Sequence, residues 1–128
     1  IMENEINKPR GPIIIDLDDT ITRGFGSYET IKPNKQVVNK INEYRAIGFE
    51  VVIFTARNMR KYSKDISKIT LNTVPKIIKW LEKNKIEVDG VIVGKPWCGY
   101  DGFYVDDKSI RPDEFVNLSF EEIKNLIK

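Results

Sequence analysis

The sequence predicts a single α/β domain built as a three-layer α/β/α sandwich around a mainly parallel sheet. Short apolar runs rich in β-branched residues alternate along the chain with segments whose apolar residues recur at helical spacing. Strands that alternate with helices in this way form parallel sheets that the helices cover. The 128 residues fit one domain, and the 41% that are hydrophobic suffice for a core. We expect a polar tail over residues 1–11 and the domain over residues 12–128.

The first half of the chain predicts a strand, a helix and a second strand. Residues 12–17 form a largely β-branched run, which is typical of a strand buried on both faces. Apolar residues then fall at helical spacing from Val37 to Ile47, and Gly48 follows where a C-terminal cap glycine belongs. Residues 51–55 are expected to form the second buried strand.

The second half continues the same alternation. A helix is predicted around residues 74–81, with Pro75 in its first turn. Third and fourth strands are predicted at residues 88–93 and 103–105. A capping box that begins at Ser119 predicts the start of the last helix.

Composition excludes several classes of function. The chain has 21 basic and 19 acidic residues, and a net charge of +2 gives no reason to expect nucleic acid or a membrane surface as a partner. It has no histidine, which removes histidine-based catalysis and histidine-containing zinc sites. The single cysteine, Cys98, can form no internal disulfide, and no apolar run approaches the ~20 residues of a membrane span. We therefore expect a cytoplasmic protein.

Polar residues follow each of the four predicted strands. Ligands of parallel α/β sheets bind beyond the carboxyl ends of the strands, so these residues are the first candidates for a functional site. In chain order they are Asp16, Asp18 and Thr20, then Thr55 and Arg57, then Lys95, and finally Asp106 and Asp107. We expect all of them at one edge of the sheet.

Four of these residues are carboxylates, which repel one another unless a cation or a proton lies between them. A site with oxygen ligands alone favours Mg²⁺. A calcium-binding EF-hand loop that starts at Asp16 is excluded, because Ile21 stands at its required glycine position and Ser27 at its required glutamate position.

The same residues fit phosphoryl transfer, which needs an in-line nucleophile, a proton donor for the leaving oxygen and positive charge. Asp16 and Asp18 are two positions apart, so on an extended strand they point the same way and can flank one phosphorus atom. We expect Asp16 to attack and Asp18 to serve the leaving group. Lys95 supplies a positive charge, and the hydroxyl of Thr55 supplies a hydrogen-bond donor.

The order of the motifs resembles the haloacid dehalogenase superfamily. The shared pattern is D-x-D-x-T after a buried strand, a threonine at the end of the next strand, a downstream lysine and a final Asp-Asp pair, over roughly residues 12–108. The resemblance implies a Rossmann-like sheet. An acid at position 18 is typical of the phosphatases and mutases of the superfamily, and phosphatases are its majority.

The resemblance also implies residue roles. Asp16 forms an aspartyl-phosphate, and Asp18 is the general acid and base, with its backbone carbonyl on the metal. Thr55 binds a phosphate oxygen, and Lys95 stabilises the nucleophile and the phosphate. The expected Mg²⁺ ligands are Asp16, Asp18, Asp106 and Asp107.

The frames D-L-D-D-T-I-T, V-V-I-F-T-A-R-N-M, V-G-K-P-W and Y-V-D-D-K further resemble small capsule-biosynthesis phosphatases of that superfamily. This implies a small phosphorylated sugar, polyol or amino alcohol as the substrate, in the synthesis of capsular or surface polysaccharide. Residues 21–32 are too few for a cap domain. We therefore expect an open site, or one that a neighbouring subunit of a homo-oligomer covers.

Loop residues near the predicted edge are candidates for substrate recognition, because exposed aromatic and basic side chains on loops often bind ligands. The strongest candidates are Thr20, Tyr28, Arg57 and Trp97. Met59 and Tyr100 are expected to be exposed in the same loops. The basic residues from Arg60 to Lys68 either steer an anionic substrate or are merely solvated.

Three alternative functions stay open. A phospho-acceptor receiver domain also uses acids, a threonine, a Lys-Pro pair and Mg²⁺, but its acidic pair belongs to the first strand, whereas here a pair follows the last predicted strand. An inactive interaction domain that kept the fold is a second alternative. A phosphomutase or nucleotide phosphatase of the same superfamily is the third.

Overall fold

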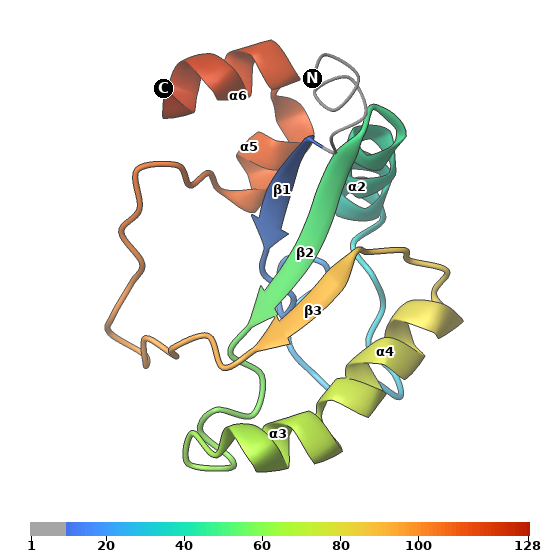
Figure 1. Cartoon of the computed structure of the whole chain (residues 1–128), viewed down its shortest axis with the longest axis vertical. Helices are drawn as coiled ribbons and strands as arrows, with labels where there is room; N and C mark the ends of the chain where they lie inside the picture. Colours follow the sequence, from blue (N-terminus) through green and yellow to red (C-terminus); the bar gives the residue numbers. More distant parts are fainter. Residues whose placement is uncertain (1–9) are drawn as a thin grey trace, which may run out of the picture.

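Residues 10–128 are described by a computed structural model, in which helices flank a three-stranded parallel sheet (Figure 1). The strands are β1 (Arg10–Ile15), β2 (Phe49–Thr55) and β3 (Gly90–Val93), in the spatial order β1-β2-β3. The helices are α2 (Lys35–Ala46), α3 (Ile66–Asn72), α4 (Val74–Lys83), α5 (Pro112–Asn117) and α6 (Phe120–Ile127). The predicted α/β class is confirmed. β1 begins inside the predicted tail, whose residues 1–9 lie outside the described part of the chain.

The pairing of the strands aligns their carboxyl ends. Ile15 of β1 pairs with Ile53 of β2, and Thr55 at the end of β2 pairs with Val93 at the end of β3. The residues that follow β1, β2 and β3 therefore leave the sheet at one edge. This is the edge at which ligands of parallel α/β sheets bind.

One face of the sheet carries the core. Val51, Ile53 and Thr55 of β2 are fully buried on this face. Helices α2 and α4 supply much of the same cluster, through Val37, Ile41, Tyr44, Ile77, Trp80 and Leu81. The strand order β1-β2-β3 steps in one direction across the sheet, and crossovers of the usual right-handed kind then place both helices on the same face, in agreement with the shared cluster.

The opposite face of the sheet is poorly covered. Ile14 of β1 and Ile92 of β3 lie on this face and are 53% and 51% exposed. Val52 and Phe54 of β2 lie between them and are partly buried. Within residues 10–128, the second helix layer of the predicted sandwich is therefore largely missing.

Several predicted helix ends are confirmed. Gly48 has φ 99° and donates its N–H to the carbonyl of Arg45 at 3.0 Å, which ends α2. Pro75 lies in the first turn of α4, and the Ser119 capping box opens α6. Helices α3 and α5 are short and were not predicted, because six or seven residues hold too few apolar positions for a clear helical period.

Residues 94–111, which we call the arm, connect β3 to α5. In Figure 1 they run as an extended loop beside the sheet. The predicted fourth strand at residues 103–105 is wrong for this structure, because these residues pair with no strand of the described chain. Phe103, Tyr104 and Val105 are 80%, 53% and 86% exposed.

No helix of the described residues is long and apolar enough to cross a membrane.

Candidate active site

Asp16 follows β1 directly and lies between two polar side chains. Its Oδ1 is 3.6 Å from the Nζ of Lys95, and its Oδ2 accepts a hydrogen bond of 3.3 Å from the hydroxyl of Thr20. Lys95 is held there because its backbone N–H donates to the carbonyl of Thr55 at 3.2 Å. The Asp16 side chain is 39% exposed, so a ligand can reach it from solvent.

A tight turn fixes the chain after Asp16. The carbonyl of Leu17, which is fully buried, accepts hydrogen bonds from the N–H groups of Thr20, Ile21 and Thr22 at 3.2, 2.9 and 3.0 Å. Asp19 has φ 60°, a left-handed conformation that aspartate tolerates better than most residues. The turn anchors the aspartate pair on a buried residue.

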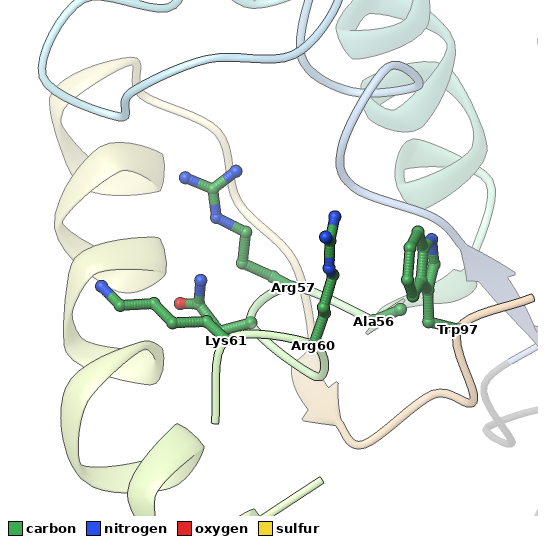
Figure 2. A pocket seen from close by; sticks show the side chains of 6 residues that line it. Ala56, Arg57, Arg60, Lys61 and Trp97 are labelled. Atoms are coloured by element: carbon green, nitrogen blue, oxygen red, sulfur yellow. The ribbon is translucent and has the colours of Figure 1, made fainter. Parts of the chain in front are cut away.

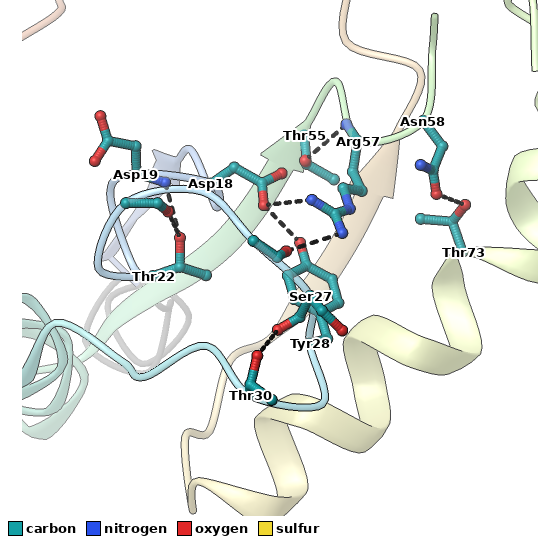
Figure 3. A network of polar contacts seen from close by, with 12 residues as sticks. Asp18, Asp19, Thr22, Ser27, Tyr28, Thr30, Thr55, Arg57, Asn58 and Thr73 are labelled. Atoms are coloured by element: carbon teal, nitrogen blue, oxygen red, sulfur yellow. Dashed lines mark hydrogen bonds and ion pairs between the residues drawn. The ribbon is translucent and has the colours of Figure 1, made fainter. Parts of the chain in front are cut away.

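Asp18 is more enclosed than Asp16, with a side chain that is 15% exposed (Figure 3). Its Oδ1 accepts a hydrogen bond of 2.9 Å from the hydroxyl of Tyr28 and one of 3.3 Å from Arg57. Burial raises the pKa of the Asp18 carboxyl above its ordinary value, and the charge of Asp16 adds to this. The Arg57 charge and the Tyr28 hydrogen bond lower the pKa but do not cancel the effect of burial.

Tyr28, which is predicted to contact substrate, donates its hydroxyl hydrogen to Asp18. Burial and the charge of Asp18 raise the pKa of Tyr28, so the phenol stays a donor at neutral pH. Arg57 lies 4.3 Å over the Tyr28 ring, and the ring of Trp80 is 5.8 Å away. This positioning role could not be predicted from the sequence, because no spacing pattern indicates which residue a single loop tyrosine contacts.

Thr55 ends β2 and is fully buried. Its hydroxyl oxygen accepts a hydrogen bond of 3.1 Å from the backbone N–H of Arg57. The hydroxyl hydrogen is not used by this bond. The guanidinium of Arg57 also donates to the carbonyl of Gly26 at 3.2 Å, which ties the loop before α2 to the end of β2.

A basic pocket of about 500 Å³ adjoins these residues (Figure 2). Its lining consists of Ala56, Arg57, Asn58, Arg60, Lys61 and Trp97. The guanidinium of Arg60 lies 5.7 Å from the Trp97 ring centroid and donates a hydrogen bond to the hydroxyl of Tyr100. Arg60 and Lys61 line this pocket and are exposed. Met59, which was expected to be exposed beside them, is buried.

Asp106 and Asp107 do not join the other acids. Both lie exposed in the arm, and the Asp106 carboxylate accepts a hydrogen bond of 3.0 Å from the backbone N–H of Lys108. This bond holds the pKa of Asp106 below its ordinary value. Within residues 10–128, no three side chains of the types His, Cys, Asp and Glu gather where they could hold a metal ion. The predicted set of four acids is therefore not assembled within one chain.

Neither a protein-family model nor a curated protein matches the chain. The chain is similar to a Vibrio cholerae protein whose crystal structure was determined as an MCSG target. The two are 45% identical, with a TM-score of 0.89, over 92% of this chain and 97% of that chain. The chain belongs to the same family as this Vibrio cholerae protein.

In this member of the family, most predicted site residues meet at the edge of the sheet. The residues brought together are Asp16, Asp18, Thr20, Tyr28, Thr55, Arg57 and Lys95. Trp97 lies in the adjoining pocket, and Asp106 and Asp107 lie apart. The arrangement offers an accessible carboxylate beside a lysine, a shielded carboxyl whose pKa is raised by burial, and a basic pocket for an anion.

Proposed function

We propose that the chain is a phosphatase of the haloacid dehalogenase type, which hydrolyses a small phosphate monoester through an aspartyl-phosphate. The observation that carries this proposal is the different setting of two carboxylates at the end of β1. Asp16 is 39% exposed beside Lys95, whereas Asp18 is 15% exposed and has a raised pKa. Environments of this kind assign one carboxylate to attack and the other to proton transfer.

In the first step, a carboxylate oxygen of Asp16 attacks the phosphorus atom and the bond from phosphorus to the leaving oxygen breaks. Asp18 in its protonated form gives its proton to that oxygen. In the second step, Asp18 takes a proton from water as the water oxygen attacks phosphorus, and the bond to Asp16 breaks to release phosphate. Lys95 and the hydroxyl of Thr55 orient and stabilise the phosphoryl oxygens.

The pocket supports a small and polar substrate. Arg57, Arg60 and Lys61 give it positive charge, and Trp97 gives it an aromatic wall. Together with the sequence resemblance, this favours a phosphorylated sugar, polyol or amino alcohol used in capsular or surface polysaccharide synthesis. The single cysteine favours the cytoplasm as the location of the enzyme.

Mg²⁺ belongs to the proposal through the resemblance, but the acids of one chain do not fit it. Asp16 faces Lys95 and Asp18 faces Arg57, while Asp106 and Asp107 lie away from both in the arm. No step of the mechanism above is therefore assigned to the metal.

The test is a screen for inorganic phosphate released from phosphorylated sugars, polyols, amino alcohols and nucleotides in the presence of Mg²⁺. We expect one class to give phosphate in large excess over enzyme, and Asp16→Asn to abolish the release because an amide is a poor nucleophile. A receiver domain would take up about one phosphoryl group per chain and hold it. Normal turnover by Asp16→Asn would refute the assigned nucleophile.

A further inference from the structure

The arm concentrates the exposed apolar surface of the protein. Among residues 10–128, thirteen large hydrophobic side chains are exposed, and five of them lie in the arm: Trp97, Tyr100, Phe103, Tyr104 and Val105. Phe103 and Val105 are at least 80% exposed. A run of exposed aromatic and β-branched side chains marks a surface that another surface covers.

Both ends of the arm are fixed to the domain. At its start, Lys95 donates its N–H to the carbonyl of Thr55 at 3.2 Å. At its end, Ile110 packs against the core, and Phe115 of α5 stacks on Tyr44 of α2 at 5.5 Å. Between these ends, the hydroxyl of Tyr104 donates to the carbonyl of Pro96 at 2.6 Å and its ring lies 4.4 Å from the Nζ of Lys95, while Phe103 and Val105 on either side stay exposed. The arm is therefore anchored at both ends and is not a loose terminus.

The sheet has a matching surface. Within the described chain, β1 pairs with β2 alone, so its other edge presents free backbone N–H and C=O groups. Ile14 of β1 is 53% exposed on the poorly covered face. An edge strand of this kind is a template for a strand from another chain.

We propose that two copies of this chain exchange arms, with residues 103–105 of each copy paired alongside β1 of the other. Parallel pairing directs the residues that follow the added strand to the carboxyl end of β1. Asp106 and Asp107 of one copy then lie beside Asp16 and Asp18 of the other, so each site is completed by both chains. The role given to these acids rests on the proposed phosphatase function, whereas the pairing itself does not.

Charge and symmetry favour this occupant. Lys95, Arg57, Arg60 and Lys61 surround the end of the sheet, so a carboxylate pair that arrives there meets positive charge. The exchange is reciprocal, which closes the assembly as a two-fold dimer and leaves neither arm exposed. The contacts that a fourth strand would make within one chain are made between two chains instead.

A cross-linking experiment distinguishes the exchange of arms between two chains from an arm that folds back on its own chain. In a Cys98→Ser background, Ile14→Cys and Tyr104→Cys are made as two single variants, and the two purified proteins carry different tags. They are unfolded together, refolded and treated with a short bis-maleimide. We expect a covalent heterodimer that contains both tags, with much less product when either variant is treated alone. The unmodified chain should have the mass of a dimer by light scattering.

One combination of results would contradict the exchange of arms. A monomeric mass for the unmodified chain, with a link within one chain when both cysteines are present together, would overturn the exchange. It would mean that the arm folds back on its own β1. The light-scattering measurement needs no variant, so failure of a cysteine variant to fold does not remove the test.

Complementation then tests the shared site. Asp16→Asn and the double variant Asp106→Asn with Asp107→Asn should each be inactive alone. Refolded together, half of the dimers are mixed, and each mixed dimer keeps one intact site, so about one quarter of the wild-type phosphatase activity should return. No return of activity, while the mixed cross-link forms, would overturn the placement of the acids. Absence of phosphatase activity in the wild-type chain would instead refute the proposed function and leave the cross-link result standing.

Discussion

The hydroxyl of Tyr28 donates a hydrogen bond of 2.9 Å to the carboxylate of Asp18, and Arg57 donates a second at 3.3 Å to the same oxygen. Both donors stabilise the charged form of Asp18, whereas burial favours the neutral form and prevails. The proton affinity of Asp18 is therefore set by a balance that single substitutions can move. A change in the pKa of Asp18 should therefore be seen as a change in the pH dependence of the reaction.

Tyr28→Phe should shift the alkaline side of the activity profile to higher pH. The substitution keeps the ring under Arg57 but removes a hydrogen bond that lowers the pKa of Asp18, so that pKa rises further. A carboxyl with a higher pKa keeps its proton to higher pH, and activity that needs the protonated acid then declines later. The measurement is kcat against pH. Tyr62→Phe, in the loop before α3, is the control and should leave the profile unchanged, and a shift of the Tyr28→Phe profile to lower pH would contradict the role of Asp18.

Asp18→Asn should lower kcat by roughly 10²- to 10⁴-fold, because the amide cannot give or take the proton. The loss should be smaller with p-nitrophenyl phosphate than with an alkyl phosphate, since a good leaving group needs less protonation. Asp19→Asn is the matched control. The backbone N–H of Asp19 makes the turn hydrogen bonds, its φ of 60° suits asparagine, and the residue is exposed, so activity should stay near wild type. Equal losses in the two variants would point to damage of the turn.

Chelation of Mg²⁺ should abolish the activity, because in the proposed dimer Asp106 and Asp107 of one copy complete the acidic site of the other. A dianionic phosphate that approaches the Asp16 carboxylate meets like charge, which the neighbouring Lys95 offsets only in part. We expect phosphate release to stop in excess EDTA and to return when Mg²⁺ is added. Full turnover in EDTA, unchanged by added Mg²⁺, would remove the metal from the proposed function.

Much of the site could be predicted from the sequence because a strand fixes both direction and spacing. Asp16 and Asp18 are two residues apart after a buried strand, and Thr55 ends the next, so parallel pairing decides where they lie. Lys95 follows β3 by the same logic. Their positions depend on local pattern and topology alone.

The arm could not be predicted in this way. Residues 103–105 have the composition of a strand, but a strand also needs a neighbour, and the pattern does not say whether that neighbour belongs to the same chain. The contact of Tyr28 with Asp18 could not be predicted from the sequence for a related reason. It depends on the packing of Tyr28 against Trp80, which is distant in sequence.

Helix α4 offers a test of the core with neighbouring residues. Ile77 is fully buried and Ile78 is 43% exposed. Ile77→Ala should lower the free energy of unfolding by about 2–5 kcal/mol, because it removes buried methyl groups and leaves a cavity. Ile78→Ala should cost less than about 1 kcal/mol, since alanine favours the helix and little packing is lost. Denaturant unfolding of both variants measures the difference, and equal costs would mean that α4 does not present the face seen here.

Trp97→Ala tests whether the pocket selects the substrate. Trp97 lines the pocket and lies 5.7 Å from the Arg60 guanidinium, while Asp16 and Lys95 bind the phosphoryl group in the proposed mechanism. Loss of the indole should therefore raise KM for the true substrate by about tenfold, equivalent to about 1.4 kcal/mol, and leave p-nitrophenyl phosphate little changed. Leu71→Ala, which removes an even more exposed apolar side chain on α3, is the control and should change neither constant. Equal losses on both substrates would place the damage at the shared phosphate site beside Lys95. No loss on either would assign Trp97 to contact between subunits, and a lower dimer mass for Trp97→Ala at low concentration would then be the expected result.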